Sequence, residues 1–314
     1  MKYFLKKLMT LIITLLLISF LSFTAFSVIP GDAALSRLGK DATEEQIETL
    51  REEMGLNDPL PERYGRWLSG AVQGDFGDSY RYQDVTVSSL LADRLPVTVL
   101  LAVISLAIIL VCAIPLGILC ARFSGSFLDL LINQVTQILM AVPAFFLGII
   151  LTYVFGLILH FFQPGNFTSP AENLTASAKY LFFPALAVAL PKIAMVVKFL
   201  RNSVISEMNK DYVRTARSKG NTETAVLYGH VLKNAMIPVV TFLAMVIAEI
   251  LAGSIVVEQV FSVPGIGRLL ISSISTRDYP VVQAIVLYVT AVVVIINFIV
   301  DVLYQFLDPR VKTV

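Results

Sequence analysis

Residues 97–121, VTVLLAVISLAIILVCAIPLGILCA, contain no charged side chain. A helix rises about 1.5 Å per residue, so a run of this length is sufficient to cross the roughly 30 Å hydrocarbon core of a bilayer. Comparable apolar runs recur along the 314-residue chain, in which 56% of the residues are hydrophobic and 15% are charged. One water-soluble core cannot bury so much apolar surface. The sequence therefore predicts an all-α, polytopic membrane protein.

Six apolar runs are long enough to span the membrane, and the first has two interpretations. The basic start with Lys2, Lys6 and Lys7 and the PGD break at residues 30–32 are typical of a signal peptide. However, its apolar run of about 22 residues exceeds the roughly 7–15 of a secretory apolar region, which favours a first transmembrane helix. The third run is long enough to tilt or to continue past the bilayer. The predicted spans are residues 8–29, 97–121, 127–159, 180–200, 238–257 and 283–307.

Positive charge is unevenly distributed over the short segments that flank these spans. Thirteen Lys and Arg residues fall on the side that holds both termini, against Lys179, Arg268 and Arg277 on the other side. Short cytoplasmic loops carry the excess of such residues, so we expect both termini in the cytoplasm. We expect three parts: an N-terminal transmembrane helix at 1–29, an extracytoplasmic subdomain at 30–96, and a five-helix membrane core at 97–314.

The segment at residues 30–96 is expected to be a small helical insert. Thr43 and Gln46 have the spacing of a capping box, and Gly55 stands where that helix would end. A second short helix, at residues 63–71, would carry Tyr64 and Trp67. Residues 31–94 contain 13 acidic and 7 basic side chains. This acidic insert is either a docking surface or a solvated lid.

The cytoplasmic segment 202–238 has the pattern of a helical hairpin. An acid at Asp211 and bases further on match the dipole of a first helix, and Gly220 follows as its stop. Thr222 is a candidate N-cap for a second helix, which we expect to break before Pro238. Because glycine adopts a positive φ at little cost, the two helices can meet at a fixed angle. Such a hairpin either transmits force from a cytosolic partner or lies on the membrane surface as a local helix-turn-helix.

The two halves of this hairpin, YVRTARSKG at residues 212–220 and HVLKNAMIP at residues 230–238, resemble the EAA loop of ABC-importer permeases. The chain keeps the general pattern at Ala216, Gly220 and Leu232. It departs from the pattern at Arg214, Thr215, His230 and Lys233, as the dipeptide/oligopeptide/nickel permease family does. Other stretches are similar to the B-type permease subunit of that family: PGD at 30–32, GLNDPL at 55–60, GDFGDS at 74–79, GSIVVE at 253–258, PGIGR at 264–268, RDYPV at 277–281 and DPR at 308–310.

This resemblance implies a type I ABC importer permease fold with six transmembrane helices. It implies a homologous second permease, two cytosolic ATPase subunits that receive the loop helices, an extracytoplasmic substrate-binding protein, and a bacterial or archaeal cytoplasmic membrane. ATP and Mg²⁺ would be held by the ATPase subunits, since this sequence contains no Gly-x4-Gly-Lys-Ser/Thr phosphate loop. We therefore expect no catalytic residue, metal or cofactor in this chain. The implied coupling residues are Arg214, Thr215, Ala216, Arg217, Gly220, His230 and Leu232.

Polar side chains inside the spans are candidates for a translocation path. A charge at bilayer depth costs roughly 2.5–3.5 kcal/mol on insertion scales and therefore requires a partner or a wet cavity. Glu249, near the middle of the fifth span, faces either the path or a subunit contact. Lys192, directly after Pro191, either lines the path or satisfies carbonyls freed by the proline. Asn133 and Gln137 are further candidates.

Two other local features have open interpretations. The PGIG segment at residues 264–267 is either a re-entrant turn that gates the outer mouth or an ordinary tight loop. His230 is expected to pack inside the hairpin rather than to bind a proton or a metal ion.

Several other classes of protein fit the sequence less well. A net charge of +1 gives no reason to expect nucleic-acid binding. Cys112 and Cys120 lie about 12 Å apart along one helix, too far for a disulfide, and the two histidines, His160 and His230, form no zinc motif. A membrane enzyme would need catalytic motifs that are missing from the sequence. An ion-coupled secondary transporter would need intramembrane relays and, usually, inverted repeats.

Among substrates, peptides are favoured over nickel. A path for a naked soft metal ion would favour His, Cys or Met lining, of which the spans contain few. A chelated metal would not need such ligands, so a nickel-chelate permease remains the alternative. A wide, mostly apolar path would suit dipolar peptides and leave recognition to the binding protein.

Overall fold

The computed structural model describes residues 2–28, 33–38, 42–82 and 84–307. The PGD and DPR motifs at 30–32 and 308–310, and the basic residues Arg310 and Lys312, lie outside the described residues. Within the described part, five helices are long and apolar enough to cross a membrane, and a sharply bent pair would make a sixth. The prediction of an all-α, polytopic membrane protein is confirmed, with five to six candidate spans in the described residues.

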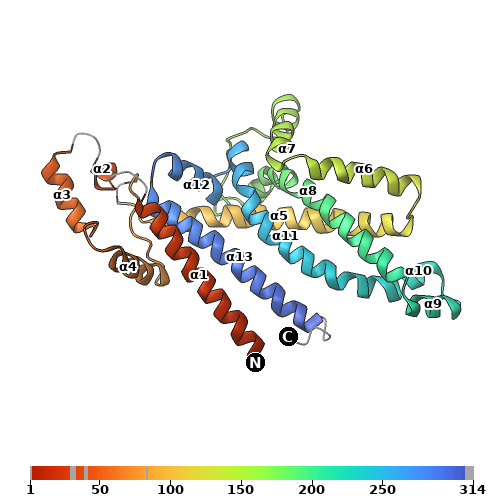
Figure 1. Ribbon diagram of the computed structural model, residues 1–314. Helices are drawn as coiled ribbons and strands as arrows, with labels where there is room; N and C mark the ends of the chain where they lie inside the picture. Colours follow the sequence, from red (N-terminus) through yellow and green to blue (C-terminus); the bar gives the residue numbers. More distant parts are fainter. Residues whose placement is uncertain (1, 29–32, 39–41, 83, 308–314) are drawn as a thin grey trace. The chain divides into compact units, whose positions relative to one another are not determined.

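The chain forms two compact units, Met1–Thr98 with Pro264–Ile295 and Val99–Val263 with Ile296–Val314. The first unit holds two membrane spans and several short helices (Figure 1). Helix α5 begins ten residues before the predicted span and continues through Pro96. The helices of this unit are α1 (Lys2–Val28), α2 (Ala33–Leu38), α3 (Glu44–Glu53), α4 (Leu60–Val72), the start of α5 (Val87–Arg122), α12 (Ile266–Ser275) and most of α13 (Tyr279–Leu307).

The ends of α3 follow the local signals of the sequence. The Thr43 side chain accepts a hydrogen bond from the amide of Gln46, and the Gln46 side chain accepts one from the amide of Thr43. This pair is the predicted capping box. After α3, Gly55 adopts a φ of +61°, and α4 confirms the second predicted short helix.

The core of the first unit joins the start of α5 to α12 and α13. Its buried residues are Val87, Leu91, Ile266, Leu269, Val281, Ala284 and Ile285. The PGIG segment leads directly into α12, where the amide of Ile266 donates to Thr98 Oγ1 at 2.9 Å. The segment is therefore the entrance to a helix. Pro264 and Gly265 precede the helix, and Ile266 and Gly267 begin it; the re-entrant gate and the ordinary tight loop both stay predictions.

The second unit is built around α8, which contacts α6, α7 and α11. Figure 1 shows α8 and α11 running side by side, with α9 and α10 at one end. The rings of Phe199 and Phe242 stack between α8 and α11 with centroids 4.4 Å apart. The elements are α6 (Phe127–Ala141), α7 (Ala144–Leu151), the π-helical turn η1 (Thr152–Ile158), α8 (Leu174–Met208), α9 (Asp211–Ser218), α10 (Glu223–Val226), the π-helical turn η2 (Leu227–Val231) and α11 (Leu232–Val260).

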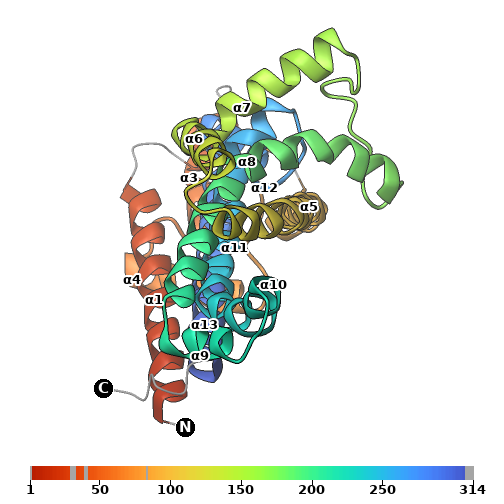
Figure 2. The same cartoon turned by 90° about the vertical axis from the view of Figure 1, so that its right-hand side faces the viewer.

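The third predicted span is not one continuous helix. It is bent by 99° between α6 and the following pair α7–η1, and Figure 2 shows α6 nearly end-on while α7 and η1 run across the view. Pro143 has no amide hydrogen, and it forces Val142 into an extended conformation with φ −92° and ψ 124°. The sequence did not predict this bend, and a run that tilts or continues past the bilayer stays a prediction.

The expected helix break before Pro238 is also wrong. A run of helix continues from Glu223 through η2 to Val260, and Pro238 lies inside it. Proline removes one backbone amide donor. In a membrane segment, contacts with neighbouring helices can compensate for this loss, so the helix can continue through the proline. Val239 and Val246 are buried, and α11 packs along α8, so tertiary packing keeps the helix intact.

Candidate functional site: a helical hairpin and an intramembrane ion pair

The first helix and the turn of the hairpin between α8 and α11 lie at the residues that the sequence indicates. Helix α9 starts at Asp211, and Gly220 follows it with a φ of +81°. Thr222 then caps α10, since its side chain accepts from the amide of Ala225 at 3.3 Å. A Cβ at residue 220 would meet no atom within 4 Å, so only the backbone conformation requires glycine there.

The inner faces of the hairpin form a small apolar core. Val213 and Ala216 of α9 are buried, as are the apolar residues Val226, Leu227 and Val231 of α10 and η2. Helix α9 contacts both α10 and η2. Ala216 therefore packs within the hairpin and holds its two arms together, and its side chain does not face outward.

Polar contacts close the hairpin across the turn. Arg217 donates to Glu223 through Nε at 2.8 Å and through Nη2 at 3.0 Å. The side-chain amide of Asn221 donates to the carbonyl of Ala216 at 2.9 Å, which satisfies the end of α9. Because two parallel hydrogen bonds join the Arg217 guanidinium to the Glu223 carboxylate, the pair fixes the relative orientation of the two arms as well as their distance.

The base of the hairpin is tied to α8. Glu207, near the end of α8, accepts from the Tyr212 hydroxyl at 2.8 Å and forms an ion pair with Lys210. Burial raises the pKa of the Tyr212 phenol above its usual value, so the hydroxyl keeps its proton and can donate. Ser203 of α8 also donates to the carbonyl of Ala235 in α11 at 2.8 Å. The hairpin is thus attached to both α8 and α11.

The outer face of the hairpin exposes several of the predicted coupling residues. Arg214, Thr215 and Tyr228 are exposed, whereas Leu232 is half-buried. His230 is exposed too, so the expectation that it packs inside the hairpin is wrong. Its neighbours Leu227 and Val231 take the buried positions of η2 instead.

Lys192 and Glu249 lie near the middles of α8 and α11, and their side chains form an ion pair. The Lys192 side chain is 20% exposed and the Glu249 side chain is 46% exposed, so the carboxylate is the more open end. The two residues are 57 positions apart in the sequence. Each charge therefore has the partner that a position at bilayer depth requires.

A second ion pair, which is more buried and which sequence reasoning missed, joins α6 to α8. Asp129 accepts from Arg201 Nε and Nη2, both at 2.7 Å, and its side chain is 5% exposed. Asn133 donates to the Asp129 carboxylate at 2.7 Å, so this candidate path residue belongs to the same network. Gln137 is exposed. The signal for this pair was an aspartate at the start of an apolar run, which needs a cation nearby.

The described residues contain no group of three or more His, Cys, Asp and Glu side chains that could hold a metal ion. Cys112 is half-buried and Cys120 is buried, and both are free thiols. The chemistry of the site therefore consists of hydrogen bonds and ion pairs between helices.

Taken together, the fold and these pairs define a multi-span membrane protein with a structured hairpin between the long helices α8 and α11. A family model described as the binding-protein-dependent transport system inner membrane component matches residues 113–313, and a model for the N-terminal part of such components matches residues 1–102. The chain belongs to this family of ABC-importer permeases.

Relatives align with the chain over almost its whole length. It is 37% identical to the oligopeptide transport system permease protein AppB of Bacillus subtilis over 312 residues, which covers 99% of both chains. It is 34% identical to the protein named "Probable peptide ABC transporter permease protein y4tP" of Sinorhizobium fredii over 310 residues, again 99% of both chains. The chain is thus a non-catalytic permease component of a transport system in the membrane.

Proposed function

We propose that this chain forms half of the translocation path of an ATP-driven importer for di- or oligopeptides. The observation that carries the proposal is the hairpin, whose two arms are fixed to each other by Arg217 and Glu223 and continue into α8 and α11. Helices α8 and α11 also carry the ion pair of Lys192 and Glu249. A force applied to the hairpin would therefore act on the helices that hold these intramembrane charges.

The partner at the hairpin is proposed to be a cytosolic ATPase subunit. The exposed residues Arg214, Thr215 and His230 would contact it, while Ala216, Arg217 and Gly220 shape the hairpin and Leu232 begins α11. The complete importer would contain a homologous second permease, two such ATPase subunits that hold ATP and Mg²⁺, and an extracytoplasmic substrate-binding protein. Relatives named as peptide permeases support the peptide class of substrate.

Both termini and the hairpin are proposed to lie in the cytoplasm of a bacterium or archaeon. Residues 30–96 would then form the extracytoplasmic subdomain, between the N-terminal helix at 1–29 and the five-helix permease core at 97–314. The distribution of Lys and Arg over the short loops supports this orientation. In the core, Lys192 and Glu249, together with Asn133 and Gln137, are proposed to be near the peptide path.

Site-directed cross-linking tests the partner and the orientation. Thr215→Cys, on the exposed face of the hairpin, should cross-link to an ATPase subunit in membranes that contain the whole transporter. Thr276→Cys is a matched control, because this exposed threonine follows α12 and would face outward. It should react with a membrane-impermeant maleimide in intact cells, whereas Thr215→Cys should not. Labelling of Thr215→Cys from outside would overturn the orientation.

Reconstitution tests the energy source and the substrate. The tagged chain, purified in mild detergent, should bring down a second permease and ATPase subunits, and proteoliposomes of the complex should accumulate labelled peptides only with ATP and the binding protein. Uptake driven by an ion gradient without ATP would favour the secondary-transporter alternative. Tight binding of nickel chelates, and no binding of peptides, by the partner binding protein would favour the nickel alternative.

A further inference from the structure

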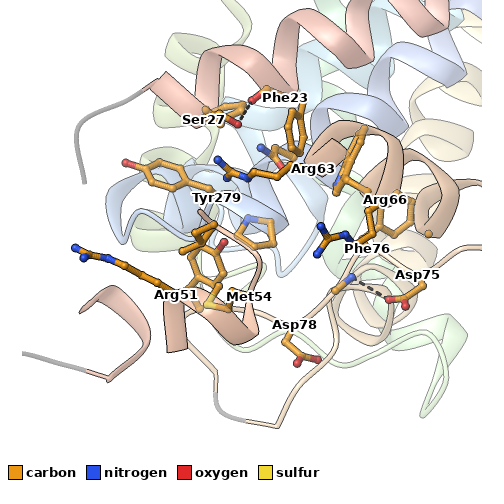
Figure 3. A pocket seen from close by; sticks show the side chains of 18 of the residues that line it. Phe23, Ser27, Arg51, Met54, Arg63, Arg66, Asp75, Phe76, Asp78 and Tyr279 are labelled. Atoms are coloured by element: carbon orange, nitrogen blue, oxygen red, sulfur yellow. Dashed lines mark hydrogen bonds between the residues drawn. The ribbon is translucent and has the colours of Figure 1, made fainter. Parts of the chain in front are cut away.

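A cavity of about 620 Å³ lies within the first unit. It is enclosed by the end of α1, the segment from α3 to α4, the loop at residues 75–80 and the start of α13. Figure 3 shows aromatic rings and guanidinium groups around it, with Asp75 and Asp78 below Arg63 and Arg66 of α4 in the view. None of these residues belongs to the hairpin or to the intramembrane ion pair.

The cavity lies at the edge of two membrane spans. Phe23, Phe26 and Ser27 are among the last six residues of α1, and Tyr279 and Gln283 are among the first five of α13. Because both α1 and α13 are candidate spans, the ends that share this cavity lie at one surface of the bilayer.

Helix α4 lies against the side of α1 at this depth. The hydroxyls of Tyr64 and Ser19 are 2.7 Å apart, and the rings of Phe23 and Trp67 have centroids 5.5 Å apart. Tyrosine and tryptophan side chains concentrate at the level of lipid headgroups. The α4 wall of the cavity therefore faces the polar border of the membrane.

The three arginines of the cavity differ in what they bind. Arg51 pairs with Glu48 and extends away from the centre of the cavity in Figure 3. Arg66 pairs with Asp58. The guanidinium of Arg63 lies 6.0 Å from the centroid of the Phe23 ring and forms no ion pair with any residue that the structure describes. Arg63 is therefore the cation that is available to a ligand.

Trp67 lines the cavity one helical turn after Arg63. The indole Nε1 of Trp67 is buried and has no hydrogen-bond partner within the described part of the chain. Leaving such a donor unpaired costs roughly 1–3 kcal/mol, and an acceptor in the cavity could reach this buried atom only if the indole turned towards it. Trp67 is also the single tryptophan of the sequence, so its fluorescence reports on this cavity.

We propose that this cavity binds a phospholipid headgroup, with the phosphate accepting hydrogen bonds from the Arg63 guanidinium. Arginine suits phosphate because its planar fork presents parallel N–H donors. We assign the phosphate to a phospholipid rather than to a soluble compound. The cavity lies at the depth where lipid headgroups are concentrated and where α4 packs against α1. The acyl chains would continue along the apolar surface of α1, where Leu17, Phe20 and Leu21 are exposed.

Quenching of Trp67 emission tests the proposal on the full chain in detergent micelles. Phosphatidylglycerol and phosphatidylethanolamine that carry bromine on the upper acyl carbons should quench it along a saturable curve. Arg63→Gln should raise the half-saturating lipid fraction about tenfold, because a charge-assisted hydrogen bond is lost. Arg63→Lys should give a smaller increase. Arg81→Gln is the matched control: this arginine bonds Ser272, does not line the cavity, and its loss should change nothing.

Two measurements on the wild-type chain separate the possible sources of the ligand and do not depend on how the variants fold. A brominated diacylglycerol, which lacks the phosphate, should quench weakly and without saturation. Soluble glycerol 3-phosphate should not restore the emission at concentrations comparable with the lipid. Equal quenching by diacylglycerol, displacement by glycerol 3-phosphate, or an unchanged curve for Arg63→Gln would each overturn the proposal.

Discussion

Arg217 holds Glu223 through two hydrogen bonds across the turn at Gly220, so one forked ion pair joins the two arms of the hairpin. The Arg217 side chain is 37% exposed and that of Glu223 is 67% exposed. Water therefore screens the pair, and its contribution to stability is at most about 1 kcal/mol. We expect the pair to matter because it fixes the angle between the two arms of the hairpin, which continue into α8 and α11.

Exchanging these charges tests that role. Arg217→Glu places two carboxylates together and should lower the peptide uptake per ATP hydrolysed about two- to fivefold, which corresponds to less than about 1 kcal/mol. The double variant Arg217→Glu/Glu223→Arg should recover most of this loss in proteoliposomes. Lys219→Ala, in the same turn, serves as the control. No recovery in the double variant would mean that Arg217 acts on a partner rather than on Glu223.

Gly220→Ala should uncouple ATP hydrolysis from uptake. The φ of +81° costs a residue with a Cβ roughly 1–2 kcal/mol, although no atom blocks the side chain. Gly229→Ala is the matched control, because Gly229 has an equally open surrounding and lies in the helical run. The ratio of uptake to phosphate release in proteoliposomes is the measurement. Equal ratios of uptake to phosphate release for Gly220→Ala and Gly229→Ala would show that coupling does not depend on the positive φ at residue 220.

Asp129→Asn should destabilise the second unit strongly. It leaves the Arg201 guanidinium charged and without its carboxylate, which typically costs about 3–5 kcal/mol. The thermal midpoint of the detergent-solubilised chain should fall accordingly. The apolar double variant Asp129→Leu/Arg201→Met should regain most of the loss, since two well-packed apolar residues can replace a buried pair. A midpoint unchanged by Asp129→Asn would show that the pair contributes little.

Glu249→Gln should slow the uptake of acidic, basic and neutral peptides by the same factor. The variant leaves the Lys192 ammonium unpaired near the middle of α8, which perturbs the helix pair rather than a recognition site. Initial rates of uptake for a series of peptides with one varied side chain provide the measurement. The double variant Lys192→Met/Glu249→Gln should restore the rate for all of them. Selective loss of one charge class would instead make Glu249 a determinant of substrate choice.

Helix ends were predictable from the sequence where the interactions are local. The capping box at Thr43, the left-handed Gly55 and Gly220, and the cap at Thr222 all involve neighbours within a few residues. Such signals need no knowledge of the rest of the fold.

Prolines in the spans show where local signals are insufficient. Val142-Pro143 ends a helix and Pro238 does not, although both prolines lack the same amide. At Pro238 the difference comes from packing along α8, which the sequence does not display. The ion pairs could not be predicted for the same reason. The sequence indicates that an intramembrane charge needs a partner, but it does not identify a partner that lies 57 or 72 positions away.

Helix α8 is bonded to its neighbours at three depths. Tyr180 donates to the carbonyl of Phe261 at 2.6 Å near one end, Lys192 pairs with Glu249 half-way, and Arg201 holds Asp129 towards the other end. An axial slide of α8 by even one residue would break all three ties together. We therefore expect α6, α8 and α11 to tilt or rotate as one block in any conformational change of this unit, rather than α8 to slide alone along its axis.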